Sequence, residues 1–196
     1  LQVTLLRRPD CHGTIVRRGT SIDKRRSLAE RRRVLTALDD RDLRILEILA
    51  REGRISKTEL ARRVNLSPTP CWDRLKRLED AGLIAGYRAE FALQKLGPHV
   101  TVFVVVELES HRSADFRVFE KAVGDMDEVV ACWAIGGGFD YLVEIVTRDI
   151  NTYQRLMDAM LADEIGLKRY FSYIVTKVVK GSGAPPFAQL LGTQKD

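Results

Sequence analysis

Basic side chains are concentrated between residues 62 and 77, and their chemistry suits the phosphates of a nucleic acid. The stretch holds one acidic residue, Asp73, against five basic ones: Arg62, Arg63, Arg74, Lys76 and Arg77. Phosphate binding depends on locally concentrated positive charge, and a guanidinium can also donate two parallel hydrogen bonds to a guanine edge. The residue types therefore indicate a surface that binds DNA.

A helix predicted over residues 67–81 positions most of these side chains. Ser67 can cap this helix, and Pro68 and Pro70 fall in a first turn whose amides have no intrahelical partner. Helical spacing gives it an apolar side formed by Cys71, Leu75 and Leu78. We expect Trp72 to be partly buried by packing. The side expected to face DNA carries Pro70, Asp73, Arg74 and Arg77.

The candidate DNA contacts are of three kinds. Ser67 and Thr69 lie near a helix N-terminus, whose free amides attract anions, and they suit phosphate or backbone contacts. The two arginines of the helix suit guanine edges. Lys76 is either a phosphate contact or a solvated surface lysine. The full set of candidates is Arg62, Ser67, Pro68, Thr69, Pro70, Asp73, Arg74, Lys76 and Arg77.

Two shorter helical patterns precede this helix. The first begins behind Asp39 or Asp40 and stops at Gly53. The second begins at residues 56–59, Ser-Lys-Thr-Glu, which have the form of a capping box. Three short helices with a sharp turn before the last are typical of a helix-turn-helix, whose third helix enters the DNA major groove. Residues 83–87 are expected to continue as an extended strand or wing.

The second half of the chain changes from helical to strand-like periodicity after Gly97-Pro98. Strands are predicted over 100–108, 128–135, 141–146 and 170–179, and helices over 115–123 and 150–161. This βαββαβ order predicts a four-stranded antiparallel sheet with two helices on one face. The first strand is apolar on both faces of its pleat, so the uncovered face predicts a dimer of two such sheets.

A glycine-rich turn, Gly136-Gly137-Gly138-Phe139-Asp140-Tyr141, separates the second and third predicted strands. One interpretation is a tight connection, because glycine reaches positive φ at low cost. The other is a ligand site in which backbone amides approach a carboxylate, while Asp140 either accepts from an ammonium group or fixes the loop.

The net charge of +5 is distributed unevenly along the 196 residues. Residues 1–38 carry +7, residues 39–91 carry +1 and residues 92–196 carry −3, so a basic N-terminal tail supplies the excess. This tail is either a nucleic-acid-binding arm or without function. The N-terminus has no apolar signal-peptide core, and no stretch has the length of a membrane span. The three cysteines show no Cys-x-x-Cys spacing, which fits a reducing compartment. We expect a cytoplasmic, nucleoid-associated protein with no membrane partner.

The first half of the chain contains the motifs Asp39-x-x-Asp42-x-x-Ile45-Leu46, Gly53-Arg54-Ile55-Ser56, Glu59-Leu60-Ala61, Leu66-Ser67-Pro68-Thr69-Pro70-Cys71, Arg74-Leu75-Lys76-Arg77-Leu78-Glu79 and Gly82-Leu83-Ile84-x-Gly86-Tyr87. In these motifs it resembles the DNA-binding part of the leucine-responsive/asparagine-regulator (Lrp/AsnC) transcription factors. The second half is similar to that family's ligand-sensing domain, including a glycine-rich turn followed by Asp-Tyr. The third glycine and Phe139 depart from the commoner family turn.

The resemblance implies an α+β fold: an N-terminal winged helix-turn-helix joined to a C-terminal ferredoxin-like βαββαβ domain that forms a dimeric α+β barrel. It implies a sequence-specific transcriptional regulator that forms dimers, which often stack into octamers, on pseudo-palindromic double-stranded DNA. The effector would be an amino acid or a related metabolite bound between dimers, with no other cofactor. The implied effector-binding residues are Met126, Asp127, Gly136, Gly137, Gly138, Asp140 and Tyr141.

A small enzyme is the main alternative, because dimeric ferredoxin-like barrels also host catalysts. Such chemistry needs an acid–base pair in an apolar pocket, and His99 and His111 are expected at the surface. No nucleophile motif, phosphate-binding loop or metal-ligand spacing is present, so no catalytic or metal residue is predicted. A third alternative, a protein that only assembles or sequesters amino acids, leaves the basic helix unexplained.

The expected domain organisation follows these changes of pattern. It comprises a basic mobile tail (1–38), a winged helix-turn-helix (39–91), a linker (92–98), a ligand-sensing and oligomerisation domain (99–180) and a C-terminal tail (181–196).

Overall fold

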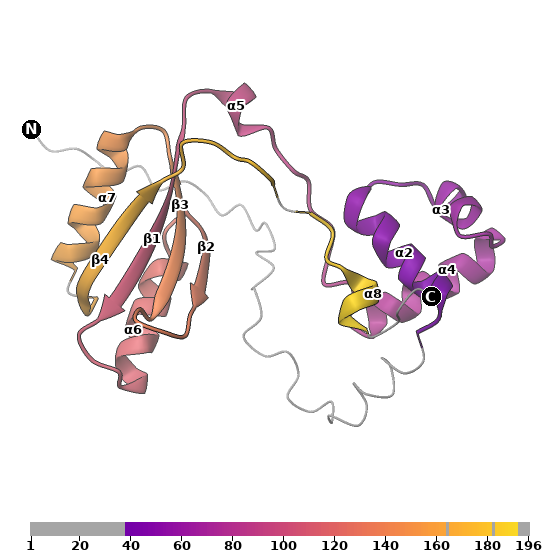
Figure 1. The fold of residues 1–196 in the computed structure, drawn as a ribbon, viewed down its shortest axis with the longest axis horizontal. Helices are drawn as coiled ribbons and strands as arrows, with labels where there is room; N and C mark the ends of the chain where they lie inside the picture. The colour runs from indigo at the N-terminus through magenta and orange to yellow at the C-terminus, as the bar shows by residue number, and fades with distance from the viewer. Residues whose placement is uncertain (1–37, 164, 182, 192–196) are drawn as a thin grey trace, which may run out of the picture. The chain divides into compact units, whose positions relative to one another are not determined.

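The computed structural model describes residues 38–163, 165–181 and 183–191. It divides this part of the chain into two compact units (Figure 1). The first unit contains the described residues up to Tyr87 together with residues 184–191, and the second spans Arg88–Gly183. The predicted basic tail lies outside the described residues, except for Leu38.

Three helices form the body of the first unit. They are α2 (Asp40–Arg51), α3 (Lys57–Arg63) and α4 (Pro68–Asp80). Their apolar sides meet in one core made of Ile45, Leu46, Leu60, Ala61, Val64, Cys71, Leu75 and Leu78. The turn between α3 and α4 contains Asn65 at φ 53°, a left-handed conformation that asparagine tolerates better than most residues. The helix-turn-helix prediction is thereby confirmed.

The helix caps differ in part from the sequence prediction. A complete capping box lies at α2, where Asp39 accepts from the amide of Asp42 and the Asp42 carboxylate accepts from the amide of Asp39. At α3, Ser56 accepts from the amide of Glu59, but the Glu59 carboxylate binds arginines instead of returning to the cap. The side chain of Ser67 makes no capping bond at α4. That helix start relies on Pro68, whose missing N–H is tolerated in a first turn.

The segment of residues 184–191, within the predicted C-terminal tail, is part of this first unit. It contains the short helix α8 (Phe187–Leu190), which contacts α2. Phe187 packs partly buried against the core of the three helices. Sequence periodicity could not reveal this contact, because a single aromatic residue behind two prolines has no repeat. Residues 83–87, expected as a wing, form no strand in the described part of this unit.

The second unit is a four-stranded antiparallel sheet in the order β2-β3-β1-β4. Its elements are α5 (Leu93–Leu96), β1 (Val100–Leu108), α6 (Ser113–Gly124), β2 (Val129–Ala134), β3 (Tyr141–Thr147), α7 (Ile150–Ala162) and β4 (Leu167–Ile174). The βαββαβ prediction is confirmed, as is the α+β fold class. The last strand begins and ends earlier than the predicted 170–179. No helix in the described ranges is long and apolar enough to cross a membrane.

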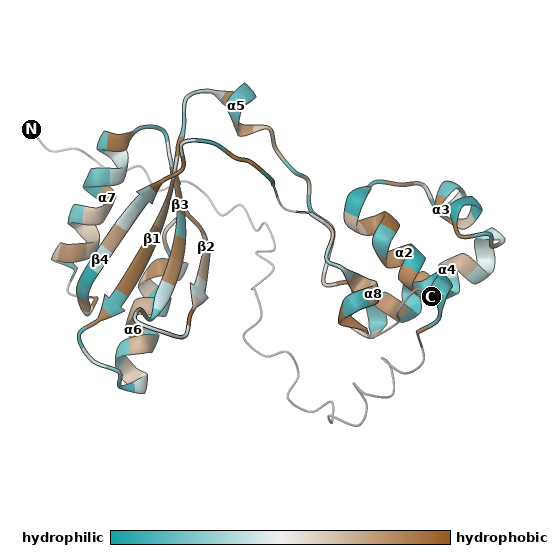
Figure 2. Cartoon of the chain, in the orientation of Figure 1, coloured by the Kyte–Doolittle hydropathy of each residue, from teal (hydrophilic) through white to brown (hydrophobic). Residues whose placement is uncertain are grey.

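The two faces of this sheet differ in what covers them. Side chains that alternate along β1 and β3, from Val102 to Leu108 and from Tyr141 to Thr147, are buried beneath α6 and α7. Figure 2 shows the hydrophobic character of these central strands. The opposite face has no covering element among the described residues. It exposes three large aromatic residues, Trp133, Phe171 and Tyr173.

Candidate DNA interface and effector site

The exposed side of α4 is the candidate DNA interface. Because Cys71, Leu75 and Leu78 are buried, the opposite side of the helix turns toward solvent. Thr69, Asp73 and Lys76 are exposed there at spacings of four and three residues, which places them in one stripe. Ser67, Pro68 and Pro70 are exposed at the N-terminal end of the helix.

Arg74 does not lie on this exposed side, which corrects the sequence prediction. Its guanidinium lies at the flank of the packing side, where Nη1 donates to Asp39 Oδ2 at 2.6 Å and to Asp42 Oδ1 at 3.0 Å. Arg77 donates through Nη2 to Asp42 Oδ2 at 2.5 Å, although half of its side chain stays exposed. The repeat of Cys71, Leu75 and Leu78 predicts that Arg74 and Arg77 lie on the side opposite the core.

Asp42 is the centre of this ion network. Its side chain is completely buried, and its carboxylate accepts from two arginines and from the amide of Asp39. A buried carboxylate is tolerated only when such partners neutralise it. Burial alone would raise the pKa of Asp39, but hydrogen bonds from the Asp42 amide and from Arg74 hold it below its ordinary value. The network therefore joins the start of α2 to α4.

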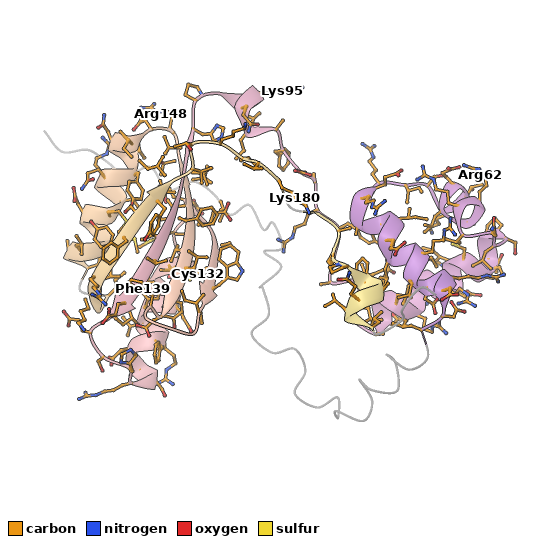
Figure 3. All side chains as sticks on the ribbon, viewed as in Figure 1. Arg62, Lys95, Cys132, Phe139, Arg148 and Lys180 are labelled. Carbon is orange, nitrogen blue, oxygen red and sulfur yellow. The ribbon has the colours of Figure 1, made fainter. Side chains whose placement is uncertain are left out.

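The other two arginines of the basic cluster also have carboxylate partners. Arg62 donates to Glu59, and Arg63 binds both Glu59 and Glu52. Hydrogen bonds from Arg62 and then Arg63 lower the pKa of Glu59 to about 2. Arg62 nonetheless lies on the outer surface, with 73% of its side chain exposed (Figure 3). Among the described residues, Lys76 alone of the five basic side chains has no ion pair.

This pairing changes the local charge balance on which the sequence prediction depended. The compensating carboxylates come from Asp39, Asp42, Glu52 and Glu59, which precede the counted stretch in the sequence. Sequence reasoning assigned no such role to them. The spacing of three residues between Asp39 and Asp42 indicates the start of a helix. It does not indicate an ion pair with α4.

Trp72 is partly buried, as the sequence predicts. It lies on α4 with 37% of its surface accessible, and the Lys57 ammonium lies 3.2 Å from its ring centroid. Lys57 is the first residue of α3 and is itself exposed. The pair therefore forms a cation–π contact at the surface of the helix-turn-helix.

The glycine-rich turn of the sheet unit is held in place by Asp140. The Asp140 carbonyl accepts from the amide of Ile135 at 2.9 Å, and its amide donates to Val106 at 2.8 Å. Its carboxylate accepts from the amide of Leu108 at 2.8 Å and lies 3.1 Å from His111 Nε2. Of the two roles left open for Asp140, these contacts favour fixing the loop.

Phe139 lies at one end of the sheet (Figure 3), where its ring contacts Phe171 of β4. Its ring meets Phe171 edge to face at a centroid distance of 5.7 Å, and the Arg169 guanidinium lies 5.5 Å from its centroid. Arg169 and Lys168 both bind Glu107. Gly136, Gly137 and Gly138, which precede Phe139, are exposed, and Gly137 has φ 131°.

Three of the expected effector residues, Tyr141, Met126 and Asp127, do not share the exposed surface of the turn in this chain. Tyr141 is buried among core side chains and its hydroxyl donates to Glu120, which together raise the pKa of the phenol. Met126 and Asp127 precede β2, whereas the turn follows it. Six residues of strand separate them by about 20 Å within one chain. Tyr141 therefore cannot touch a ligand without unpacking, and Met126 and Asp127 do not face the turn of their own chain.

No group of three or more His, Cys, Asp or Glu residues in the described ranges could hold a metal ion.

Comparison with protein families gives a match in each unit. Residues 38–85 match the model of a winged helix-turn-helix DNA-binding domain, and residues 101–185 match the Lrp/AsnC ligand binding domain. Together the two matches cover more than half of the chain.

Individual proteins are similar over most of their length. The chain is 50% identical over 147 residues to the transcriptional regulatory protein DoeX of Halomonas elongata. The matched region covers 75% of this chain and 93% of that protein. It is 40% identical to the proline dehydrogenase transcriptional activator of Rhizobium radiobacter, over 74% of this chain and 94% of that one. A solved transcriptional regulator from Neisseria meningitidis in complex with L-methionine superposes with a TM-score of 0.74. The two are 32% identical, and the superposition covers 78% of this chain and 99% of that one.

Proposed function

The chain belongs to the Lrp/AsnC family of DNA-binding transcriptional regulators, and on this basis we propose which of its surfaces bind DNA, a second copy and an amino acid. The family match gives the protein a DNA-binding helix-turn-helix and an amino-acid-binding regulatory domain.

DNA binds to the exposed stripe of α4. The observation that carries this proposal is that Thr69, Asp73 and Lys76 share one solvent-facing side of the helix, while the core occupies the other. Lys76, without an ion pair in the described ranges, supplies the phosphate contact. The same surface includes Arg62, Ser67, Pro68, Pro70 and Arg77. Arg74 is left out, because Asp39 and Asp42 occupy its guanidinium.

A second copy covers the open face of the sheet. Trp133, Phe171 and Tyr173 expose between 46% and 58% of their surfaces there, and such apolar exposure is typical of an interface. A twofold dimer presents two α4 helices, so its DNA site is pseudo-palindromic with half-sites about one helical turn apart or a multiple of it.

An amino acid binds at residues 136–140. The glycine amides approach the carboxylate of the effector, Phe139 supports its side chain, and Asp140 holds the turn in shape. The similar Neisseria regulator in complex with L-methionine supports this ligand class. Met126 and Asp127 are too far away in one chain, so they join the site only from another chain where two dimers meet.

These roles are those of a regulator without catalytic activity, bound to the nucleoid in the cytoplasm. Fragments of the source genome selected by the full chain test the proposal. Selected fragments should carry two related half-sites, and binding should weaken steeply as salt rises, because phosphate contacts release counterions. Binding that does not depend on salt or sequence would contradict it.

A further inference from the structure

Trp72 occupies a position on α4 that suits contact with DNA bases. It is the fifth residue of the helix and lies within its N-terminal half, the part of a recognition helix that meets base edges. It is exposed beside the stripe, three residues after Thr69 and one before Asp73. From Thr69 to Lys76 the stripe measures about 10 Å along the axis, comparable to the about 12 Å width of the major groove.

The core of the unit does not account for this side chain. Tryptophan is usually well buried, yet Trp72 keeps 37% of its surface exposed and does not belong to the cluster of buried residues. Lys57 stands against its ring, which restrains the indole at the surface. The rest of the exposed indole is apolar surface that water covers in the free protein.

We propose that Trp72 is a specificity-determining residue that contacts the 5-methyl group of a thymine in the major groove, with Lys57 holding the indole in position. This inference rests on the proposed DNA-binding function of α4. Thymine is the base that presents an apolar group in that groove, whereas guanine and cytosine present only hydrogen-bonding groups. An indole offers one N–H donor and no acceptor, so its apolar ring surface is its main means of contact.

Replacement of thymine by deoxyuridine tests the contact, because it removes only the methyl group. Each thymine of a selected fragment is replaced in turn, and the full chain is titrated against every fragment. Wild type should lose about fourfold in affinity at one thymine of a half-site, which is the effect of one buried methyl group. The Trp72→Ala variant should bind the original fragment more weakly and show no further loss at that thymine.

Two controls separate the contact from effects on folding. Phe91→Ala removes an exposed aromatic side chain from the other unit and should keep the fourfold deoxyuridine effect. Trp72→Gln keeps a long side chain on the helix and, titrated well below its own unfolding temperature, should lack the effect.

The possible failures are distinguishable. Equal deoxyuridine effects in wild type and Trp72→Ala, or none at any thymine, would overturn the role of Trp72 while leaving DNA binding intact. Failure of wild type to select any fragment would overturn the proposed function and this inference together.

Discussion

Separate replacement of Arg74 and Lys76 should distinguish a loss of folding stability from a loss of DNA affinity. Both are basic residues of α4 and lie only two positions apart. Arg74 neutralises the buried Asp42, whereas Lys76 is exposed and has no ion pair among the described residues. We therefore expect Arg74→Ala to destabilise the helix-turn-helix and Lys76→Ala to weaken DNA binding.

The cost of Arg74→Ala follows from what Asp42 loses. Removing one partner of a fully buried ion pair costs about 3–5 kcal/mol. Asp42 retains its bonds to Arg77 and to the Asp39 amide, and Arg74 itself is 26% exposed. A smaller cost of about 2–3 kcal/mol is therefore expected, which corresponds to a fall of about 10–15 °C in the Tm of a small domain. Exposed Lys76→Ala should change stability by less than about 0.5 kcal/mol.

Thermal unfolding of the full chain and DNA titration at several salt concentrations measure the two effects. At a temperature where both variants are folded, Arg74→Ala should bind a selected fragment as wild type does. Lys76→Ala should reduce the salt dependence by about one phosphate contact per bound chain. A stable Arg74→Ala that binds weakly would show that this guanidinium contacts bases, and the ion-network argument would be wrong.

Three further predictions concern the effector turn, the cap of α7 and the contact of α8. Asp140→Ala should abolish the effect of an amino acid on DNA binding, measured across an amino-acid panel, while His111→Ala, which leaves the Leu108 bond to Asp140, should keep it. The pKa of Asp149, lowered to about 2 from 3.8 chiefly by the Thr152 amide, implies stability that is present above 3.8 and lost as the pH falls to about 2. Asp149→Asn should flatten acid unfolding over that range, and an unchanged curve would rule out this cap. Phe187→Ala should lower the Tm of the helix-turn-helix unit and leave the sheet unit unchanged, whereas equal Tm values would mean that α8 contributes nothing.

Sequence periodicity predicts those parts of the fold that depend on local pattern. The repeats around Cys71, Leu75 and Leu78 mark the buried side of α4, and the alternation along β1 marks a strand. The start of α4 also follows from Pro68.

Sequence periodicity does not predict contacts between residues that are far apart in the chain. Asp42 and Arg74 are 32 positions apart, so no helical spacing links them. Their ion pair engages the guanidinium that the sequence predicts to face DNA. The family resemblance implies that Tyr141 binds the effector together with the exposed turn. The alternation of β3 instead places its side chain in the core beneath α6.

In the proposed regulator, one chain joins DNA recognition to amino-acid sensing. Footprinting of the full chain on a selected genomic fragment, with and without each amino acid of a panel, tests this coupling directly. We expect two protected half-sites about one helical turn apart or a multiple of it, with occupancy that changes for at least one amino acid. A single unpaired footprint, or occupancy that no amino acid alters, would contradict it.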